Sequence, residues 1–124
     1  MRAIRLTGFG GTEVLRIDEA DMPRPGNGEL FIRVAAAGVN WADLHQRQGH
    51  YPPPPGASKI LGLEVAGEIV AHGTGTEQSW NIGDMVCALV PGGGYAEYCV
   101  SHSGCCLPVP RKYGTYRRRI FAGG

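Results

Sequence analysis

The stretch that decides the fold is residues 35–70, AAAGVNWADLHQRQGHYPPPPGASKILGLEVAGEIV. Its segment 40–49 (NWADLHQRQG) predicts a helix, because Asn40 can cap the first turn and Gly49 can end the last one. Asp43 stands at the third helical position, where a carboxylate stabilises the unpaired amides of a helix start. A single short helix is therefore expected.

Strands are expected on both sides of this helix. Four prolines at 52–55 stiffen the loop that follows it. Residues 63–71 (LEVAGEIVA) then predict a strand, in which Gly67 indicates a bulge or a barrel bend. Alternating or apolar runs between turn residues predict further strands at 1–6, 14–18, 29–37, 85–90 and 95–101.

Two of these strands carry more specific expectations. Residues 29–37 (ELFIRVAAA) are apolar enough to be covered on both faces of a sheet. Residues 95–101 follow a Pro-Gly-Gly-Gly turn, so we expect them to pair with residues 85–90 as a hairpin. With 20 glycines among 124 residues, about twice ordinary usage, the chain is predicted to be a mainly β barrel or sandwich.

Length and composition exclude several classes of protein. A chain of 124 residues suits one domain with one core. No apolar run approaches the ~20 residues of a membrane span, and the start MRAIRLTGFG lacks the apolar core of a secretion signal. We therefore expect a cytoplasmic protein with no membrane partner.

The charges are distributed unevenly along the chain. Residues 1–110 hold 7 Lys and Arg against 11 Asp and Glu, whereas residues 111–124 hold five basic residues and no acid. The body therefore has no basic field for nucleic acid, and no nucleic-acid partner is expected. We expect residues 111–124 to be disordered and dispensable.

Four cysteines, at positions 87, 99, 105 and 106, have none of the spacings of a metal knuckle. We expect reduced, partly buried thiols and no disulfide framework. A rival metal-ligand set of Cys87, Cys99 and His102 has no supporting spacing.

Four features occur in an order that closely resembles the N-terminal catalytic domain of quinone oxidoreductases. They are the helix start at Asn40, the Tyr51 proline loop, GLEVAG at 62–67 and GDMV at 83–86. The likeness is to the zeta-crystallin-like, p53-inducible quinone oxidoreductase branch of the medium-chain dehydrogenase/reductase superfamily, and it extends to about Pro110. It implies a GroES-like, partly open β-barrel with one or two short helices, NADPH as cofactor and a quinone or related enone as substrate. For the full-length enzyme it implies a homo-oligomer.

The resemblance also implies a zinc-independent subclass. Zinc alcohol dehydrogenases of this superfamily have Cys where this chain has Asn40 and His where it has Leu63. Leucine cannot bind a metal and an amide oxygen is a poor zinc ligand. The four-cysteine lobe that holds a structural zinc is also missing, since residues 94–98 (GYAEY) run on directly. We expect no metal.

The resemblance implies the site residues as well. Tyr51, Asn40 and Asp43 are the implied catalytic residues, and these three with Gln46 are the implied cofactor-binding residues. The Tyr51 hydroxyl and the Asn40 amide are hydrogen-bond donors that could stabilise a developing oxyanion.

Structural interpretations of the same residues remain open. Asn40 and Asp43 could be only a helix-capping pair, and Tyr51 could be loop packing. We expect Glu64 to be a buried, paired carboxylate and Trp41 to belong to the core or to a cleft wall. The four histidines are expected at ordinary polar positions: His45, His50, His72 and His102.

Beyond Pro110 the chain departs from the family pattern. Residues 111–124 (RKYGTYRRRIFAGG) match neither the Ala-rich helix nor the Rossmann domain that follows in relatives, and no G-x-G-x-x-G follows a strand. We therefore expect a GroES-like domain at 1–110, a divergent basic tail at 111–124 and no Rossmann domain. The predicted function is that of an NADPH quinone oxidoreductase fragment, inactive alone. The alternatives are a non-catalytic GroES-like binding module that pairs with full-length subunits, and a truncated chain without function.

Overall fold

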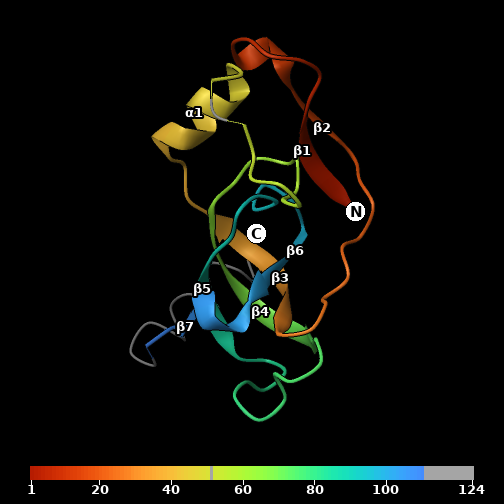
Figure 1. Cartoon of the computed structure of the whole chain (residues 1–124), viewed down its shortest axis with the longest axis vertical. Coiled ribbons are helices and arrows are strands. Elements are labelled where there is room, and N and C mark those ends of the chain that lie inside the picture. The colour runs from red at the N-terminus through yellow and green to blue at the C-terminus, as the bar shows by residue number, and fades with distance from the viewer. Residues whose placement is uncertain (51, 111–124) are drawn as a thin grey trace.

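The computed structural model describes residues 1–50 and 52–110. These residues form seven strands, one α-helix and two short 3₁₀ turns (Figure 1). The elements in chain order are β1 (Arg2–Leu6), η1 (Thr12–Val14), β2 (Leu15–Glu19), β3 (Glu29–Ala37), α1 (Trp41–Arg47), β4 (Glu64–His72), β5 (Met85–Leu89), β6 (Tyr98–His102), η2 (Ser103–Cys105) and β7 (Cys106–Pro108). The expected mainly β class with a short helix is confirmed.

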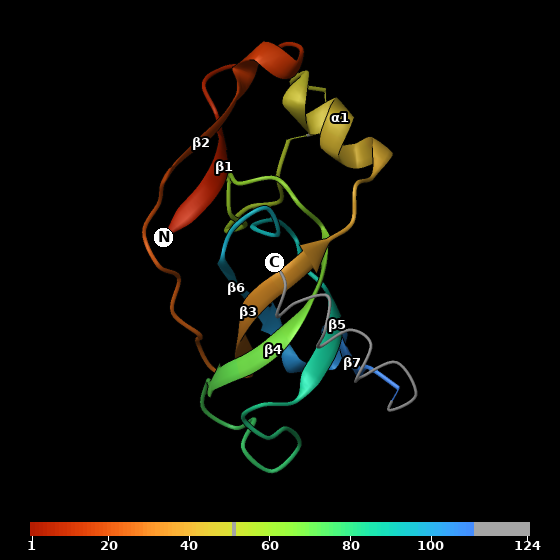
Figure 2. The ribbon, with the colours of Figure 1, turned by 180° about the vertical axis from the view of Figure 1, so that it is seen from behind.

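The strands form two antiparallel sheets. β1 and β2 make a two-stranded hairpin, and the other five strands make a sheet in the order β6-β3-β4-β5-β7. The hairpin and α1 lie together at one end of the molecule, and the larger sheet fills the other end (Figures 1 and 2). The expected strands and helix all form, with boundaries shifted by up to three residues, whereas η1, η2 and β7 were not predicted.

The expected hairpin between residues 85–90 and 95–101 is wrong. β6 pairs with β3, with Phe31 opposite Val100, whereas β5 pairs with β4 and β7. The reason lies in the glycine-rich loop between β5 and β6, which bonds to another segment. The amides of Gly93 and Gly94 donate to the carbonyls of Ile60 and Gly62, at 2.8 and 3.1 Å. The chain therefore turns toward residues 60–62 and not back along β5.

The core lies on the inner face of the five-stranded sheet. Alternate residues of its strands are buried there, among them Leu30, Ile32, Val65, Ile69, Val86, Ala88 and Cys99. The prediction that residues 29–37 are covered on both faces is wrong, because Ala35, Ala36 and Ala37 are exposed. The ladder with β6 covers only the first part of β3 and ends at the pair Arg33–Tyr98, so the last residues of β3 extend past it.

The bend expected at Gly67 is confirmed. The β3–β4 register shifts between Val34 and Ala36, opposite Gly67 and Ala66. A Cβ added at Gly67 would lie 2.2 Å from the carbonyl oxygen of Arg33, so the two backbones approach more closely than any side chain allows. Glycine is therefore required at this position for β3 and β4 to pair.

Tyr95, just before β6, connects the two ends of the molecule. Its amide donates to the Leu61 carbonyl at 2.9 Å, and its carbonyl accepts from the Ile4 amide of β1 at 2.8 Å. Its hydroxyl donates to the Gly38 carbonyl at 3.1 Å and to Oδ2 of Asp43 in α1 at 2.6 Å. One residue therefore binds the hairpin, the helix, the β3–α1 connection and the loop before β4.

The four cysteines are free, with Cys99 and Cys106 buried and Cys87 and Cys105 exposed. Burial raises the pKa of the Cys99 thiol to about 12, with a smaller contribution from Cys106. The expected disorder of residues 111–124 concerns a segment that lies outside the described residues.

Replacing Gly67 with alanine is expected to destabilise the fold by about 2–4 kcal/mol, because the new methyl group forces β3 and β4 apart. Urea unfolding of the two proteins measures the difference. Gly8→Ala is the control, since a Cβ at Gly8 has no neighbour within 4 Å. Equal stability of the Gly67 variant and the wild type would contradict the close approach described above.

Stability is expected to fall as the pH rises from about 9 toward 12. A thiol whose pKa is higher in the folded state than in the unfolded state favours folding below its unfolded pKa, and this advantage disappears as the pH rises to its folded pKa. Melting temperatures measured between pH 8 and pH 11 test this. Cys99→Ala should flatten the alkaline decline, whereas replacement of the exposed Cys87 should not. Parallel curves for all three proteins would show that Cys99 does not cause the decline.

Candidate functional site

Asn40 and Asp43 meet at the start of α1. Asn40 is the N-cap, with extended backbone angles, and its backbone amide donates to Oδ2 of Asp43 at 2.9 Å. The Asp43 amide in turn donates to the Asn40 carbonyl at 3.0 Å. The capping relationship considered for these residues is therefore present, and it fixes the orientation of Asn40 relative to the helix.

The Asp43 carboxylate is buried, with 3% of the residue exposed. Its Oδ2 accepts from the Asn40 amide and from the Tyr95 hydroxyl. Its Oδ1 is buried and has no hydrogen-bond partner within the described part of the chain. Burial and the adjacent Asp43 carboxylate raise the pKa of the Tyr95 phenol well above its usual value, so Tyr95 remains a donor.

Sequence reasoning missed Tyr95. It follows a run of glycines at 92–94, and no spacing links it to the helix more than fifty positions earlier. The sequence carries no signal for it, because the burial of Asp43, which makes a donor necessary, is itself visible only in the structure.

The Asn40 side chain turns away from Asp43 toward β4. Its amide nitrogen lies 3.3 Å from Oε1 of Glu64. The prediction of a buried Glu64 is wrong, because this residue is exposed, although it does have a partner. Its carboxylate lies close over Gly38, where an added Cβ would overlap Oε1, and the residue as a whole stays open to solvent.

Gln46 is buried, with 4% of the residue exposed, on the next turn of the helix. It lines a hollow of about 660 Å³ together with Phe9, Lys59 and prolines 52 and 53. Asp43 instead lines a second hollow, of about 530 Å³, and Asn40 lines neither of these two. The structure thus brings Asn40 and Asp43 together and places Gln46, on the same buried side of the helix, at a different hollow. Tyr51 lies outside the described residues.

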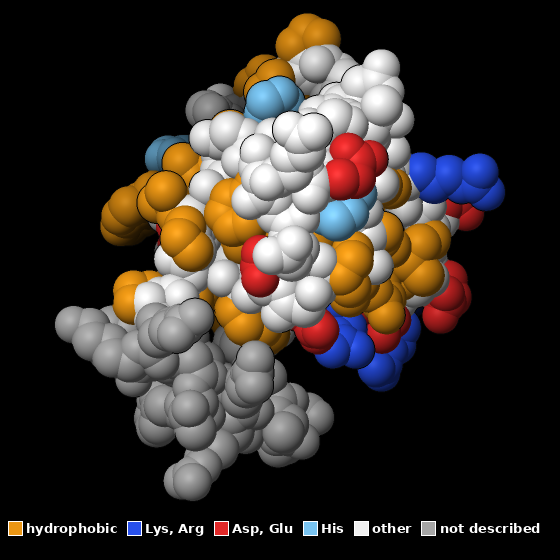
Figure 3. All heavy atoms as spheres, turned by 90° about the horizontal axis from the view of Figure 1, so that it is seen from below, with side chains coloured by type: hydrophobic (Ala, Val, Ile, Leu, Met, Phe, Trp, Pro, Cys, Tyr) orange, Lys and Arg blue, Asp and Glu red, His pale blue; other side chains and the backbone are white. Residues whose placement is uncertain are grey.

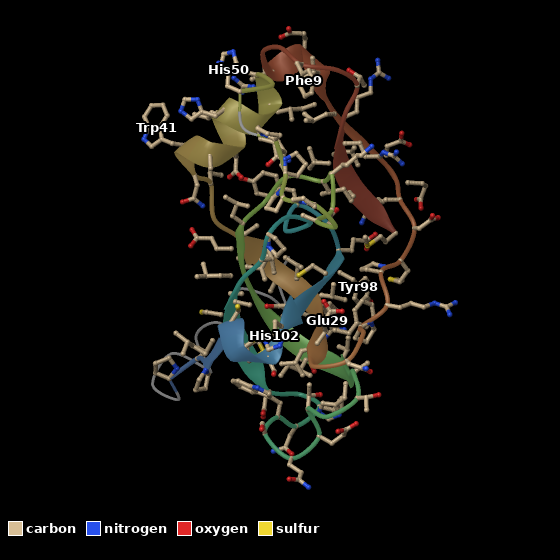
Figure 4. The ribbon with its side chains drawn as sticks, viewed as in Figure 1. Phe9, Glu29, Trp41, His50, Tyr98 and His102 are labelled. Atoms are coloured by element: carbon tan, nitrogen blue, oxygen red, sulfur yellow. The ribbon has the colours of Figure 1, made fainter. Side chains whose placement is uncertain are left out.

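Trp41 is 78% exposed and projects from the helix into solvent (Figure 4). Of the two places expected for it, the core is therefore wrong, and a cleft wall stays a prediction. It occupies the first turn on the side away from the buried Asp43 and Gln46. Among the histidines, His72 bonds to the Trp80 carbonyl at 2.6 Å, and the other three are exposed, as expected for ordinary polar positions.

Within 1–50 and 52–110, no three His, Cys, Asp or Glu side chains lie close enough to hold a metal ion together. Over the same residues, no helix has both the length and the apolar character needed to cross a bilayer.

Comparison with known proteins gives consistent relatives. Residues 26–111 match the family model of the alcohol dehydrogenase GroES-like domain. The chain is 41% identical over 113 residues to the mouse synaptic vesicle membrane protein VAT-1 homolog-like, covering 91% of this chain and 25% of that protein. It is 38% identical over 112 residues to rat quinone oxidoreductase, covering 89% of this chain and 34% of the enzyme.

Solved structures of similar proteins have the same fold as this chain. The human VAT-1 homolog-like protein superposes with a TM-score of 0.82 at 38% identity, covering 90% of this chain and 35% of that one. A mycobacterial protein solved in complex with NADPH superposes with a TM-score of 0.79 at 37% identity, covering 90% and 34%. The chain thus spans about a quarter to a third of the length of these relatives. It belongs to the alcohol dehydrogenase GroES-like domain family, among the quinone oxidoreductase-like members of the medium-chain dehydrogenase/reductase superfamily.

Proposed function

We propose that residues 1–110 form the substrate-side domain of a zinc-independent oxidoreductase that transfers a hydride from NADPH to a quinone or similar enone. The observation that carries this proposal is the capped start of α1, which holds the side-chain amide of Asn40 beside the first residues of β4. The similarity to rat and guanaco quinone oxidoreductases, at 38% and 40% identity, supports the substrate class.

The donor set supports a reaction without zinc. Asn40 and Leu63 stand where zinc enzymes of the superfamily have a cysteine and a histidine. Leu63 offers no ligand atom, and the Asn40 amide offers an oxygen that binds zinc weakly. Polarisation of a substrate carbonyl would then depend on hydrogen-bond donors, which suffices for a readily reduced quinone.

Asn40 suits this role because its side chain makes only one weak hydrogen bond within the described residues. Its hydrogen bond to Glu64 is long, at 3.3 Å, and the carboxylate is exposed, so exchanging it for a substrate oxygen costs little. Asp43 is too buried to touch a substrate. We therefore assign Asp43 a positioning role, in which its carboxylate holds the Asn40 backbone in place.

NADPH, when bound, supplies the hydride. Of the implied contacts, Asn40 fits this ligand, because its half-buried amide carries both a donor and an acceptor, as a nicotinamide carboxamide does. Gln46 lines its own hollow and Tyr51 follows the same helix, and we propose both as further contacts. The NADPH complex of the similar mycobacterial protein supports this cofactor.

We expect no turnover from the 124 residues alone. A dinucleotide is anchored at a glycine-rich turn and a helix N-terminus, and the sequence contains no G-x-G-x-x-G after a strand. Hydride transfer would need a dinucleotide-binding domain in addition, and the relatives are long enough to contain one.

A non-catalytic role as an assembly module is the second candidate. Leu89 and Leu107, on the neighbouring strands β5 and β7, are 64% and 70% exposed. Figure 3 shows apolar side chains open to solvent on the lower face of the molecule. Such exposed apolar side chains are typical of a surface that contacts another domain or subunit. Co-purification with a longer subunit, without any effect of Asn40 substitutions on activity, would favour this role.

Joining residues 1–110 to the remaining part of rat quinone oxidoreductase is expected to give NADPH-dependent quinone reduction. In this chimera Asn40→Ala should lower kcat/KM by about 10–100-fold, since loss of a well-placed oxyanion donor costs about 10²–10³ and quinones need less help. Steady-state kinetics with a benzoquinone measures the effect.

Asn81→Ala is the matched control. Like Asn40, Asn81 donates its backbone amide to an aspartate three positions later, Asp84, at 2.9 Å. Equal kcat/KM for the Asn40 variant and the parent chimera would remove Asn40 from the reaction. Tight zinc binding by the chimera, measured by elemental analysis, would contradict the zinc-independent subclass.

A further inference from the structure

β2 is an open edge of the two-stranded sheet. It pairs with β1 on one side, and among residues 1–50 and 52–110 no strand pairs with its other side. The outer edge of β1 is occupied, because the Ile4 amide donates to the Tyr95 carbonyl and Ala3 forms a bridge with Ala96. An open edge presents backbone amides and carbonyls that can pair with a further strand.

The bonds between β1 and β2 show which residues face the open edge. The Thr7 amide donates to the Val14 carbonyl and the Ala20 amide donates to the Met1 carbonyl. Because such bonds occur at every second residue of an antiparallel strand, the even-numbered residues of β2 face β1 and the odd-numbered ones face outward. Ile17, at the centre of β2, therefore directs its amide and carbonyl outward, and its side chain is 74% exposed.

The side chains of β2 allow a second copy of this strand to pair with it in one register. In an antiparallel pairing with Ile17 opposite Ile17 of the other copy, Arg16 stands opposite Asp18 twice. Both charges are exposed, and neither forms an ion pair within the described residues. A shift of two residues places Arg16 opposite Arg16 or Asp18 opposite Asp18, and a shift of one residue brings outward backbone groups against inward ones.

We propose that this chain forms a two-fold symmetric dimer, in which two copies of β2 pair antiparallel about Ile17 and join the two hairpins into one four-stranded sheet. The two Ile17 residues exchange backbone hydrogen bonds, and each Arg16 meets Asp18 of the other copy. The paired Ile17 side chains also remove from water part of an apolar surface, since Ile17 and the 77% exposed Val39 line the same hollow. The dimer uses no residue of the proposed hydride-transfer site and does not depend on that function.

Sedimentation equilibrium of the full 124-residue chain tests the dimer. A five-residue edge buries less than a standard interface, so we expect weak association, with a dissociation constant of about 10–500 µM. Hydrogen exchange at the Ile17 amide is expected to slow as the protein concentration rises from about 10 µM to about 1 mM. A chain that stays monomeric up to about 1 mM, or a dimer without this protection of Ile17, would overturn the proposal.

Charge reversals test the register. Arg16→Asp and Asp18→Arg should each weaken self-association by about tenfold or more, because each places two pairs of like charges opposite one another. An equimolar mixture of the two variants restores both unlike pairs, so it should associate about as strongly as the wild type. This recovery also shows that the single variants are folded.

Arg24→Asp and Asp21→Arg are the matched controls. They make the same changes of charge at exposed positions just after β2, outside the pairing, so each should associate like the wild type. Undiminished association of the two β2 variants would refute this interface. A mixture of them that associates no better than either alone would refute the register.

Discussion

The hydrogen bond from the Tyr95 hydroxyl to the buried Asp43 carboxylate, 2.6 Å long, constrains much of this structure. The hairpin and the helix form one end of the molecule, and the five-stranded sheet forms the other (Figure 1). Tyr95 belongs to the loop that leads into the sheet, and its backbone bonds to Ile4 and Leu61 while its hydroxyl reaches Gly38 and Asp43. Because the acceptor is charged and buried, this contact is worth more than a surface hydrogen bond and more costly to lose.

The arrangement of the site follows from this contact. Asp43 is fixed by Tyr95, and Asp43 in turn fixes the Asn40 backbone, so the Asn40 amide is presented beside β4 with its side chain only weakly engaged. The other oxygen of the same carboxylate, Oδ1, is buried and has no hydrogen-bond partner among the described residues. One buried acid therefore links Tyr95 to the Asn40 side chain that is presented at the surface.

Local sequence patterns predicted the strands and the helix. They did not predict strand pairing or burial, which depend on residues far apart in the sequence. The helix cap at Asn40, the helix end at Gly49 and the bend at Gly67 depend on backbone rules within a few residues, and these predictions are confirmed. The hairpin prediction failed because the loop before Tyr95 bonds to residues 60–62, which no local pattern records. The burial of Glu64 was wrong for a similar reason, since its exposure depends on which distant segments cover the start of β4, and the sequence does not show this.

The candidate site shows the same contrast between features set by local sequence and features set by distant residues. The resemblance selected Asn40, Asp43 and Gln46, but their separation into different environments depends on which side of α1 the hairpin and the proline loop cover. Their roles in catalysis stay predictions. The exposure of Trp41 depends equally on what the helix packs against, because its neighbours in sequence give no sign of the buried side.

The central claim is that Tyr95 and Asp43 act as one unit, and a double-mutant cycle measures this directly. The free energy of unfolding would be determined for wild type, Tyr95→Phe, Asp43→Asn and the double variant. Each single change is expected to destabilise the protein, and the double variant is expected to lose less than the sum of the two, by about 1–3 kcal/mol. Additive losses, with a difference below about 0.5 kcal/mol, would show that the two residues act independently.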